Sequence, residues 1–206
     1  MSFKLFTSDI LFFQRVLRAE GLYLGKLDGD WGPKTEKAVN QFLEKSDQIK
    51  HQFGMFDVRT EACIATLATL AQQQARICIR HMLDRGLIAR IISGTRTYEE
   101  QNILYRKGRF SNPGPRVTNA RGGESNHNFG VAWDIGLFTA TGGYLADGIQ
   151  YTQAGQAGKS AQTEWGGEWT KFVDKPHYQL RLPLPVSELR KRFEEGSLHY
   201  QDLLRR

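Results

Sequence analysis

Three side chains of the kinds that bind divalent transition metals occur in two short stretches that lie far apart in the chain. The first stretch, residues 125–134 (SNHNFGVAWD), contains His127 and Asp134, and the second, residues 174–177 (DKPH), contains His177. Catalytic zinc takes three protein ligands and leaves one position for water. If these three side chains bind one ion, the chain must fold so that the two stretches meet.

Asp174 precedes the last of these ligands by three positions. Water bound to catalytic zinc has a pKa of about 7, and a carboxylate beside it can take and return protons. We therefore assign His127, Asp134 and His177 as ligands of Zn²⁺ and Asp174 as the general base. Either stretch alone is common in unrelated chains, so the prediction depends on finding both together.

The residues around the ligands predict the local structure that carries them. Gly130 permits a turn, and the residues after it, VAWDIGLF, are rich in the β-branched and aromatic side chains typical of strands. We expect His127 to leave a loop and Asp134 to project from that strand. Pro176 disfavours a helix, so DKPH predicts a tight turn that enters the strand HYQLRL.

Together the two stretches resemble the SxHxxGxAxD and (D/E)xxH signatures of a zinc peptidase family. Its members are D-Ala-D-Ala carboxypeptidases and L-alanyl-D-glutamate endopeptidases, and many are phage endolysins. The matching residues are Ser125, His127, Gly130, Ala132, Asp134, Asp174 and His177. The resemblance implies an α+β fold, the hedgehog-like zinc peptidase domain, in which an antiparallel sheet with flanking helices carries the metal.

Residues 89–93 (ARIIS) predict a buried strand, and a helix is predicted over 98–107. Residues 93–109 resemble a further family segment, SGxRTxxEQxxLYxxGR. In related enzymes the arginine at the position of Arg96 faces the metal, where a guanidinium would stabilise an oxyanion. The resemblance implies this catalytic role for Arg96. The alternative is a structural arginine that bridges Glu99 or Glu100.

Four more residues are candidates for substrate binding. Ser125 belongs to the first motif, and Arg116 and Arg121 lie in a loop over 108–124 that is rich in glycine, proline and arginine. Trp165 lies in EWGGEW, residues 164–169, which resembles the family's WGG(D/E)W segment. For the arginines the alternative is a flexible, solvated loop, and for the tryptophan it is structural packing beside the site.

Residues 8–45 predict two helices around a turn and resemble the small helical peptidoglycan-binding domain. Its pattern, GxYxGxxDGxxGPxTxxAVxxFQ after a first helix, is matched here except that Leu43 replaces the final glutamine. The matching residues are Gly21, Tyr23, Gly25, Asp28, Gly29, Gly32, Pro33, Thr35, Ala38, Val39 and Phe42. The candidates for glycan contact are Tyr23, Leu24, Asp28, Asp30 and Trp31. The alternative is a helical hairpin that only packs on the catalytic domain.

The expected organisation is a binding domain over 1–48, a linker over 49–58 and a peptidase domain over 59–206. A single long helix is expected over 59–84, with Cys63 and Cys78 as free, buried thiols. Shorter helices are expected over 151–162 and from residue 186.

Charge and hydropathy limit the partners. The net charge is +6, and the whole excess of basic over acidic residues lies after residue 58. This favours anionic partners such as wall polymers, although a solvated surface explains it equally well. We find no nucleic-acid motif, and no apolar run reaches the roughly 18 residues of a membrane helix. The N-terminus lacks a convincing signal peptide, so we expect a protein made in the host cytoplasm that reaches the wall after the membrane is permeabilised. We also expect a monomer.

These features predict an endolysin that degrades bacterial peptidoglycan by zinc-dependent hydrolysis of a stem-peptide bond, L-alanyl-D-glutamate. The alternatives are a D-Ala-D-Ala carboxypeptidase and a non-catalytic wall-binding protein with a vestigial metal site. The site residues do not separate the two peptidases, because the shape of the cleft sets which bond is cleaved.

Overall fold

The computed structural model describes residues 6–204, which form two compact units. The first unit consists of the chain through Lys45, Arg96–Phe129 and the chain from Leu182 onward, and the second of Ser46–Thr95 and Gly130–Arg181. Residues 1–5, the start of the expected binding domain, lie outside the described residues. Within residues 6–204, none of the helices combines the length and apolar character needed to span a bilayer.

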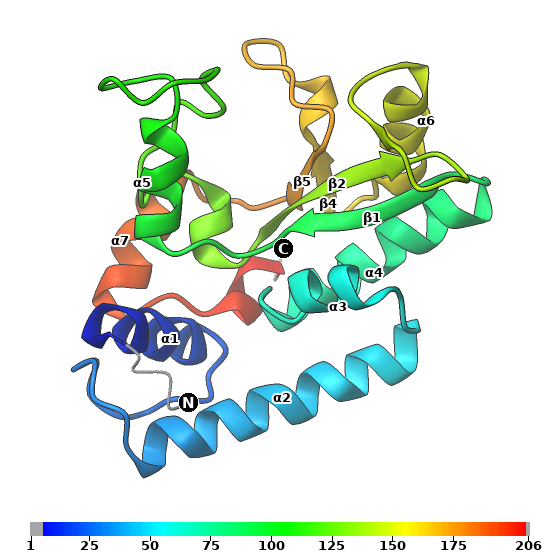
Figure 1. Ribbon diagram of the computed structural model, residues 1–206. Helices are drawn as coiled ribbons and strands as arrows, with labels where there is room; N and C mark the ends of the chain where they lie inside the picture. Colours follow the sequence, from blue (N-terminus) through cyan, green and yellow to red (C-terminus); the bar gives the residue numbers. More distant parts are fainter. Residues whose placement is uncertain (1–5, 205–206) are drawn as a thin grey trace. The chain divides into compact units, whose positions relative to one another are not determined.

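The second unit is built on an antiparallel sheet with helices beside it (Figure 1). Its strands are β1 Ile88–Ser93, β2 Ala132–Phe138, β3 Tyr144–Leu145, β4 Thr163–Trp165 and β5 His177–Leu180. Its helices are α3 Val58–Ile64, α4 Thr69–Asp84, α6 Ile149–Gly158 and the 3₁₀ turn η2 Gly166–Glu168. The spatial order is β1-β2-β5-β4, with β3 paired to β2. The expected α+β fold and the strands expected at 89–93, after Gly130 and after Pro176 are confirmed.

One face of the sheet forms the core of this unit. Trp133 and Tyr178 are fully buried and stack with their ring centroids 6.2 Å apart. Helix α6 comes close to this layer because it carries glycine at two contact points. A Cβ atom at Gly158 would lie 2.6 Å from Cys78 Sγ, and one at Gly155 would lie 2.3 Å from the ring of Trp165. Any larger side chain at either position would push the helix away from the core.

The long helix expected over 59–84 is wrong, because two helices separated by residues 65–68 occupy this range. The break is fixed by distant partners. Thr66 Oγ1 donates to the carbonyl of Cys63 and accepts from the backbone N–H of Thr95. The N–H of Ala68 donates to the carbonyl of Gly130. The prediction of free thiols is confirmed, but only Cys78 is fully buried, while Cys63 is half-buried.

The first unit is held together by an aromatic cluster drawn from distant segments. Its elements are α1 Thr7–Ala19, the start of α2 Pro33–Phe53, α5 Tyr98–Arg106, the 3₁₀ turns η1 Asn126–Phe129 and η3 Tyr200–Leu204, and α7 Val186–Glu195. The ring of Phe193 lies 5.5 Å from Phe12 and 5.4 Å from Phe129. Helix α1 therefore shares a core with residues of α7 and η1. The domain boundaries at 48 and 58 stay a prediction.

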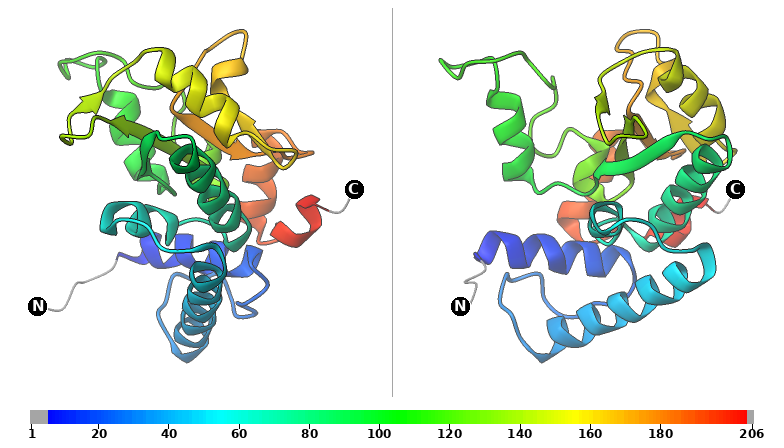
Figure 2. Two further views of the ribbon diagram at one scale, coloured as in Figure 1. Left: turned by 90° about the vertical axis from the view of Figure 1, so that its right-hand side faces the viewer. Right: turned by 45° about the vertical axis from the view of Figure 1, so that its right-hand side comes forward.

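Helix α2 extends further than the sequence pattern suggested. It runs unbroken to Phe53 (Figure 2), so the first five residues of the expected linker are helical and residues 54–57 join α2 to α3. Ile49 is buried, and Ser46 accepts a hydrogen bond from Gln72 Nε2 at 2.9 Å. The polar C-terminal part of α2 is therefore stabilised by contacts within the second unit. The periodicity of its own sequence does not reveal these contacts.

A buried ion pair ties α3 to α4. The guanidinium of Arg76 is almost fully buried and makes two hydrogen bonds of 2.8 Å to the carboxylate of Glu61. Burial opposes ionisation of Glu61, but the bonds from Arg76 and from the N–H of Phe56 outweigh it and lower the pKa of this carboxyl. A lowered carboxyl pKa stabilises the folded state above the usual pKa and loses that effect as the pH falls through the folded value.

Replacing Glu61 with Gln should therefore lower the free energy of unfolding by about 3 kcal/mol at neutral pH, because it leaves a buried guanidinium without its charge partner. The difference from wild type should shrink in acid, where Glu61 itself becomes protonated. Urea denaturation measures it. Glu99→Gln is the control: its pair with Arg106 is exposed to solvent, so losing it should change the free energy of unfolding little. Equal, small losses in both variants would contradict this account.

Candidate metal centre

Two of the predicted ligands are direct neighbours across the sheet. Asp134 on β2 is paired with His177 on β5, and Asp134 Oδ1 lies 3.2 Å from His177 Nδ1. Residues directly opposite each other on antiparallel strands point to the same face. Both side chains are largely buried, with exposed fractions of 18% and 9%. The strand pairing itself thus brings two of the three candidate ligands together.

The segments that lead into these strands are fixed by backbone contacts. Gly130 has a φ of +69°, and a Cβ atom there would lie 3.0 Å from the backbone nitrogen of Ala68, so this turn requires glycine. On the other side, the N–H of His177 donates to the carbonyl of Asp174 at 3.1 Å, and Pro176 accepts from the N–H of Ile135 at 2.9 Å. The predicted turn at DKPH is confirmed.

His127 lies in the 3₁₀ turn η1 and is 2% exposed. Its carbonyl accepts from the backbone N–H of Arg96 at 3.0 Å. The neighbouring Asn128 is buried; its side-chain amide donates to the carbonyl of Arg96 and its side-chain oxygen accepts from the N–H of Gly123. Hydrogen bonds of the His127 carbonyl and of the Asn128 side chain therefore fix the position of this turn.

His127, Asp134 and His177 each offer a ligand atom, and these atoms all lie within 4.8 Å of one another. Zinc bonds imidazole nitrogen and carboxylate oxygen at about 2.0–2.2 Å with tetrahedral geometry, which places neighbouring ligand atoms about 3.3 Å apart. The 3.2 Å between Asp134 Oδ1 and His177 Nδ1 agrees with that spacing. The donor set, two imidazoles and one carboxylate, is one that catalytic zinc uses. The residues present therefore fit such an ion.

The electrostatic environment favours a cation at this place. Burial of the His177 ring opposes protonation. The hydrogen bond to Asp134 and its charge outweigh burial and, with Gln179 and Asp174, raise the pKa of His177. The carboxylates that attract a proton to this ring attract a metal ion equally.

Comparison with known proteins identifies the family of this chain. Residues 118–180 match the family model described as D-alanyl-D-alanine carboxypeptidase. The peptidoglycan L-alanyl-D-glutamate endopeptidase CwlK of Bacillus subtilis (strain 168) is 37% identical over 125 residues, which cover 55% of this chain and 73% of that protein. The chain belongs to this peptidase family. A solved structure, the L-Ala D-Glu endopeptidase ChiX of Serratia marcescens, is 24% identical, covers 61% of this chain and 88% of its own, and has a TM-score of 0.48.

Membership in this family makes the protein an enzyme, a metallopeptidase with a His/Asp/His site. The motifs that carry the resemblance, from Ser125 to His177, lie within the matched range. The alternative of a wall-binding protein with a vestigial site is set aside.

The turn that carries Asp174 is anchored by the family's tryptophan-rich segment. Trp165 is 5% exposed, and its Nε1 donates to the carbonyl of Lys175 at 2.7 Å. The N–H of Asp174 donates to the carbonyl of Gly166 at 3.0 Å. Trp165 was a candidate for substrate binding. The structure favours the alternative, packing beside the site, because the ring is buried and its one polar group holds the turn.

The remaining site candidates are placed as follows. Arg96 is half-buried, and its Nη1 lies 3.4 Å from Gln101 Oε1. Ser125 Oγ accepts from the N–H of His127 at 3.4 Å, a local turn contact. Arg121 is exposed, and its guanidinium carbon lies 5.1 Å from the centroid of the Tyr105 ring. Arg116 is exposed. Their contact with a substrate stays a prediction.

Among the candidates for wall contact, Tyr23 is buried and offers little surface to a ligand. Its ring is 4% exposed in the core of the N-terminal helices, and its hydroxyl donates to the carbonyl of Lys26. Leu24 is 87% exposed and Trp31 is 46% exposed, and Asp28 and Asp30 are also at the surface. Asp28 has a structural contact as well: a hydrogen bond from the buried Gln14 lowers its pKa.

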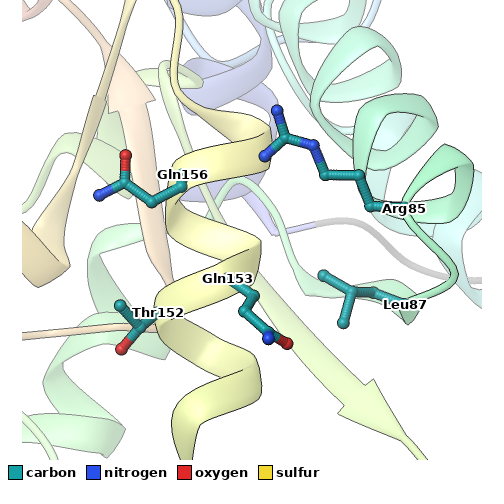
Figure 3. A pocket seen from close by; sticks show the side chains of 5 residues that line it. All are labelled: Arg85, Leu87, Thr152, Gln153 and Gln156. Carbon is teal, nitrogen blue, oxygen red and sulfur yellow. The ribbon is translucent and has the colours of Figure 1, made fainter.

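A hollow of about 360 Å³ in the second unit lies away from this chemistry (Figure 3). Its lining comes from α6 and the turn after α4: Arg85, Leu87, Thr152, Gln153 and Gln156. None of the three ligands lines it, and it contains no carboxylate, imidazole or thiol. This hollow therefore does not mark the metal centre.

Replacing His127 or His177 with Ala should abolish metal binding, because catalytic zinc depends on all three protein ligands. We expect about one zinc ion per chain in the wild type. Elemental analysis after dialysis measures the stoichiometry, and circular dichroism checks the fold. His81→Ala, which removes an exposed histidine of α4, is the matched control and should keep its zinc. Full occupancy in both ligand variants would place the ion elsewhere.

Proposed function

We propose that this protein is a zinc-dependent endopeptidase that cleaves the L-alanyl-D-glutamate bond of the peptidoglycan stem peptide. The observation that carries the proposal is the group formed by His127, Asp134 and His177 with Asp174 in the adjoining turn. The likeness to CwlK, which is named for this bond, supports the choice of substrate.

Zinc bound by the three ligands would supply a Lewis acid that activates water near neutral pH and polarises a carbonyl. Asp174 is the general base that takes a proton from the attacking water, and it returns that proton to the leaving amine. The guanidinium of Arg96 stabilises the oxyanion that forms at the scissile carbonyl. The single carboxylate among the ligands leaves net positive charge on a divalent ion, which keeps the site electrophilic.

For Arg96, the alternative was a structural bridge to Glu99 or Glu100. Both carboxylates have other partners: Glu99 pairs with Arg106, and Glu100 forms a capping box with Thr97 at the start of α5. These contacts favour the catalytic role.

Digestion of purified peptidoglycan tests the reaction and the bond together. The proposal predicts new amino-terminal D-glutamate, detected by mass spectrometry and abolished by a chelator. The second candidate, a D-Ala-D-Ala carboxypeptidase, is favoured by the description of the matching family model and would release free D-alanine instead. Absence of both products from zinc-loaded protein would refute the proposed activity.

Asp174→Asn should keep stoichiometric zinc but lose turnover, because the amide cannot accept the proton of the attacking water. Asp84→Asn, which changes an exposed residue at the end of α4, is the control and should keep full activity. An active Asp174→Asn enzyme would remove the assigned base.

In the same assay, Arg96→Ala should lower turnover by about 10²–10³-fold, as loss of an oxyanion donor does.

We also propose that the N-terminal helices bind peptidoglycan and raise the local concentration of the enzyme at the wall. The two exposed apolar residues of the loop between α1 and α2, Leu24 and Trp31, are the best candidates for glycan contact. In this proposal the protein is a monomeric, modular endolysin made in the host cytoplasm. Lysis of an expressing host only after its membrane is permeabilised would support that setting.

Binding to purified sacculi tests the N-terminal surface, with Asp174→Asn as the background so that the wall is not digested. Adding Trp31→Ser should weaken binding by about tenfold or more, as loss of an aromatic anchor does. Val58→Ser is the control, since Val58 is also an exposed apolar residue but lies on α3, outside the N-terminal helices. The same affinity in both variants would favour a hairpin with a purely structural role.

A further inference from the structure

A line of polar contacts leads from His177 away from the other metal ligands. Nδ1 of His177 faces Asp134 at 3.2 Å, while Nε2 lies 3.0 Å from Oε1 of Gln179. Nε2 of Gln179 in turn donates to Oε2 of Glu164 at 3.0 Å. Arg181 lies beyond, with its Nη1 3.6 Å from the other oxygen of Glu164.

The orientation of the Gln179 amide follows from its far partner. A carboxylate such as Glu164 only accepts, so the end of the amide that faces it must be the NH₂ group. The oxygen of Gln179 therefore faces His177, and an amide oxygen only accepts. Nε2 of His177 must then carry a proton, which in the neutral ring leaves the lone pair on Nδ1, the nitrogen beside Asp134.

The sheet makes this arrangement possible. Gln179 lies two residues after His177 on β5, so both side chains point to the same face. Gln179 is paired with Glu164 on β4, just as His177 is paired with Asp134 on β2. Three neighbouring strands of the second unit thus present the contacts from Asp134 to Glu164.

We propose that Gln179 is a positioning residue for the metal centre: with Glu164 it holds His177 in the tautomer and ring orientation that present Nδ1 to the ion. The inference rests on the proposed metal function and deepens it. Metal-binding histidines commonly donate their second nitrogen to an acceptor, and loss of that acceptor typically costs about 10–100-fold in metal affinity. A neutral amide performs this task without adding negative charge next to the electrophilic site.

Zinc affinity, measured by competition with a chromophoric chelator, tests the proposal. Gln179→Met keeps the length of the side chain but removes the acceptor, and it should weaken zinc binding by about 10–100-fold. Gln179→Glu combined with Glu164→Gln restores an acceptor at 179 and a donor at 164, and should recover affinity to within about threefold of wild type. Gln153→Met, which changes an exposed glutamine of α6, is the control.

Long-range ¹H–¹⁵N spectra of the histidine rings give an independent result that a purely structural residue would not affect. In zinc-loaded wild type, His177 should show a protonated Nε2 and a metal-bound Nδ1. This measurement needs no variant, so it decides the matter even if Gln179→Met fails to fold. Metal on Nε2, equal affinity of Gln179→Met and wild type, or no recovery in the double variant would each overturn the proposal. Wild type that binds no zinc would instead refute the proposed function.

Discussion

The pairing of β2 with β5 is the constraint on which the rest of the site depends. It places Asp134 directly opposite His177 on one face of the sheet. A slip of one residue would turn every side chain of a strand to the other face. The opposite face prevents such a slip, because Trp133 and Tyr178 are stacked and fully buried there. The geometry of the ligands is thus set by packing on the far side of the same two strands.

The turn that carries Asp174 is also fixed by residues outside it. This turn contains a proline and two charged residues, a composition that would not hold one conformation by itself. It is tied by the indole N–H of Trp165, by the carbonyl of Gly166 and by an ion pair between Lys175 and Asp147. Trp165 is itself packed against Gly155 of α6. The proposed general base is therefore carried on a turn whose order comes from contacts with the core.

The three candidate ligands were predictable from sequence because they belong to residue types that bind metals and lie in short motifs with fixed spacings. His127, Asp134 and His177 were identified without coordinates, and the strands around two of them follow from short-range patterns. Features that depend on distant partners were missed. The helix break at residues 65–68 follows from bonds to Thr95 and Gly130, and periodicity along one segment carries no information about either. The burial of Tyr23 is a property of how two helices meet.

What the sequence determined by itself is the identity of the three candidate metal ligands and the local structure that holds two of them, since ligand type, turn residues and strand patterns act over a few positions. The tertiary structure alone decided which atom of each group faces which neighbour. The role of Gln179 shows the reason: its spacing from His177 places both on one face, but only the strand beside it, with Glu164, sets the direction of the amide. Hydrogen-bond direction depends on partners that the fold brings together from separate parts of the chain.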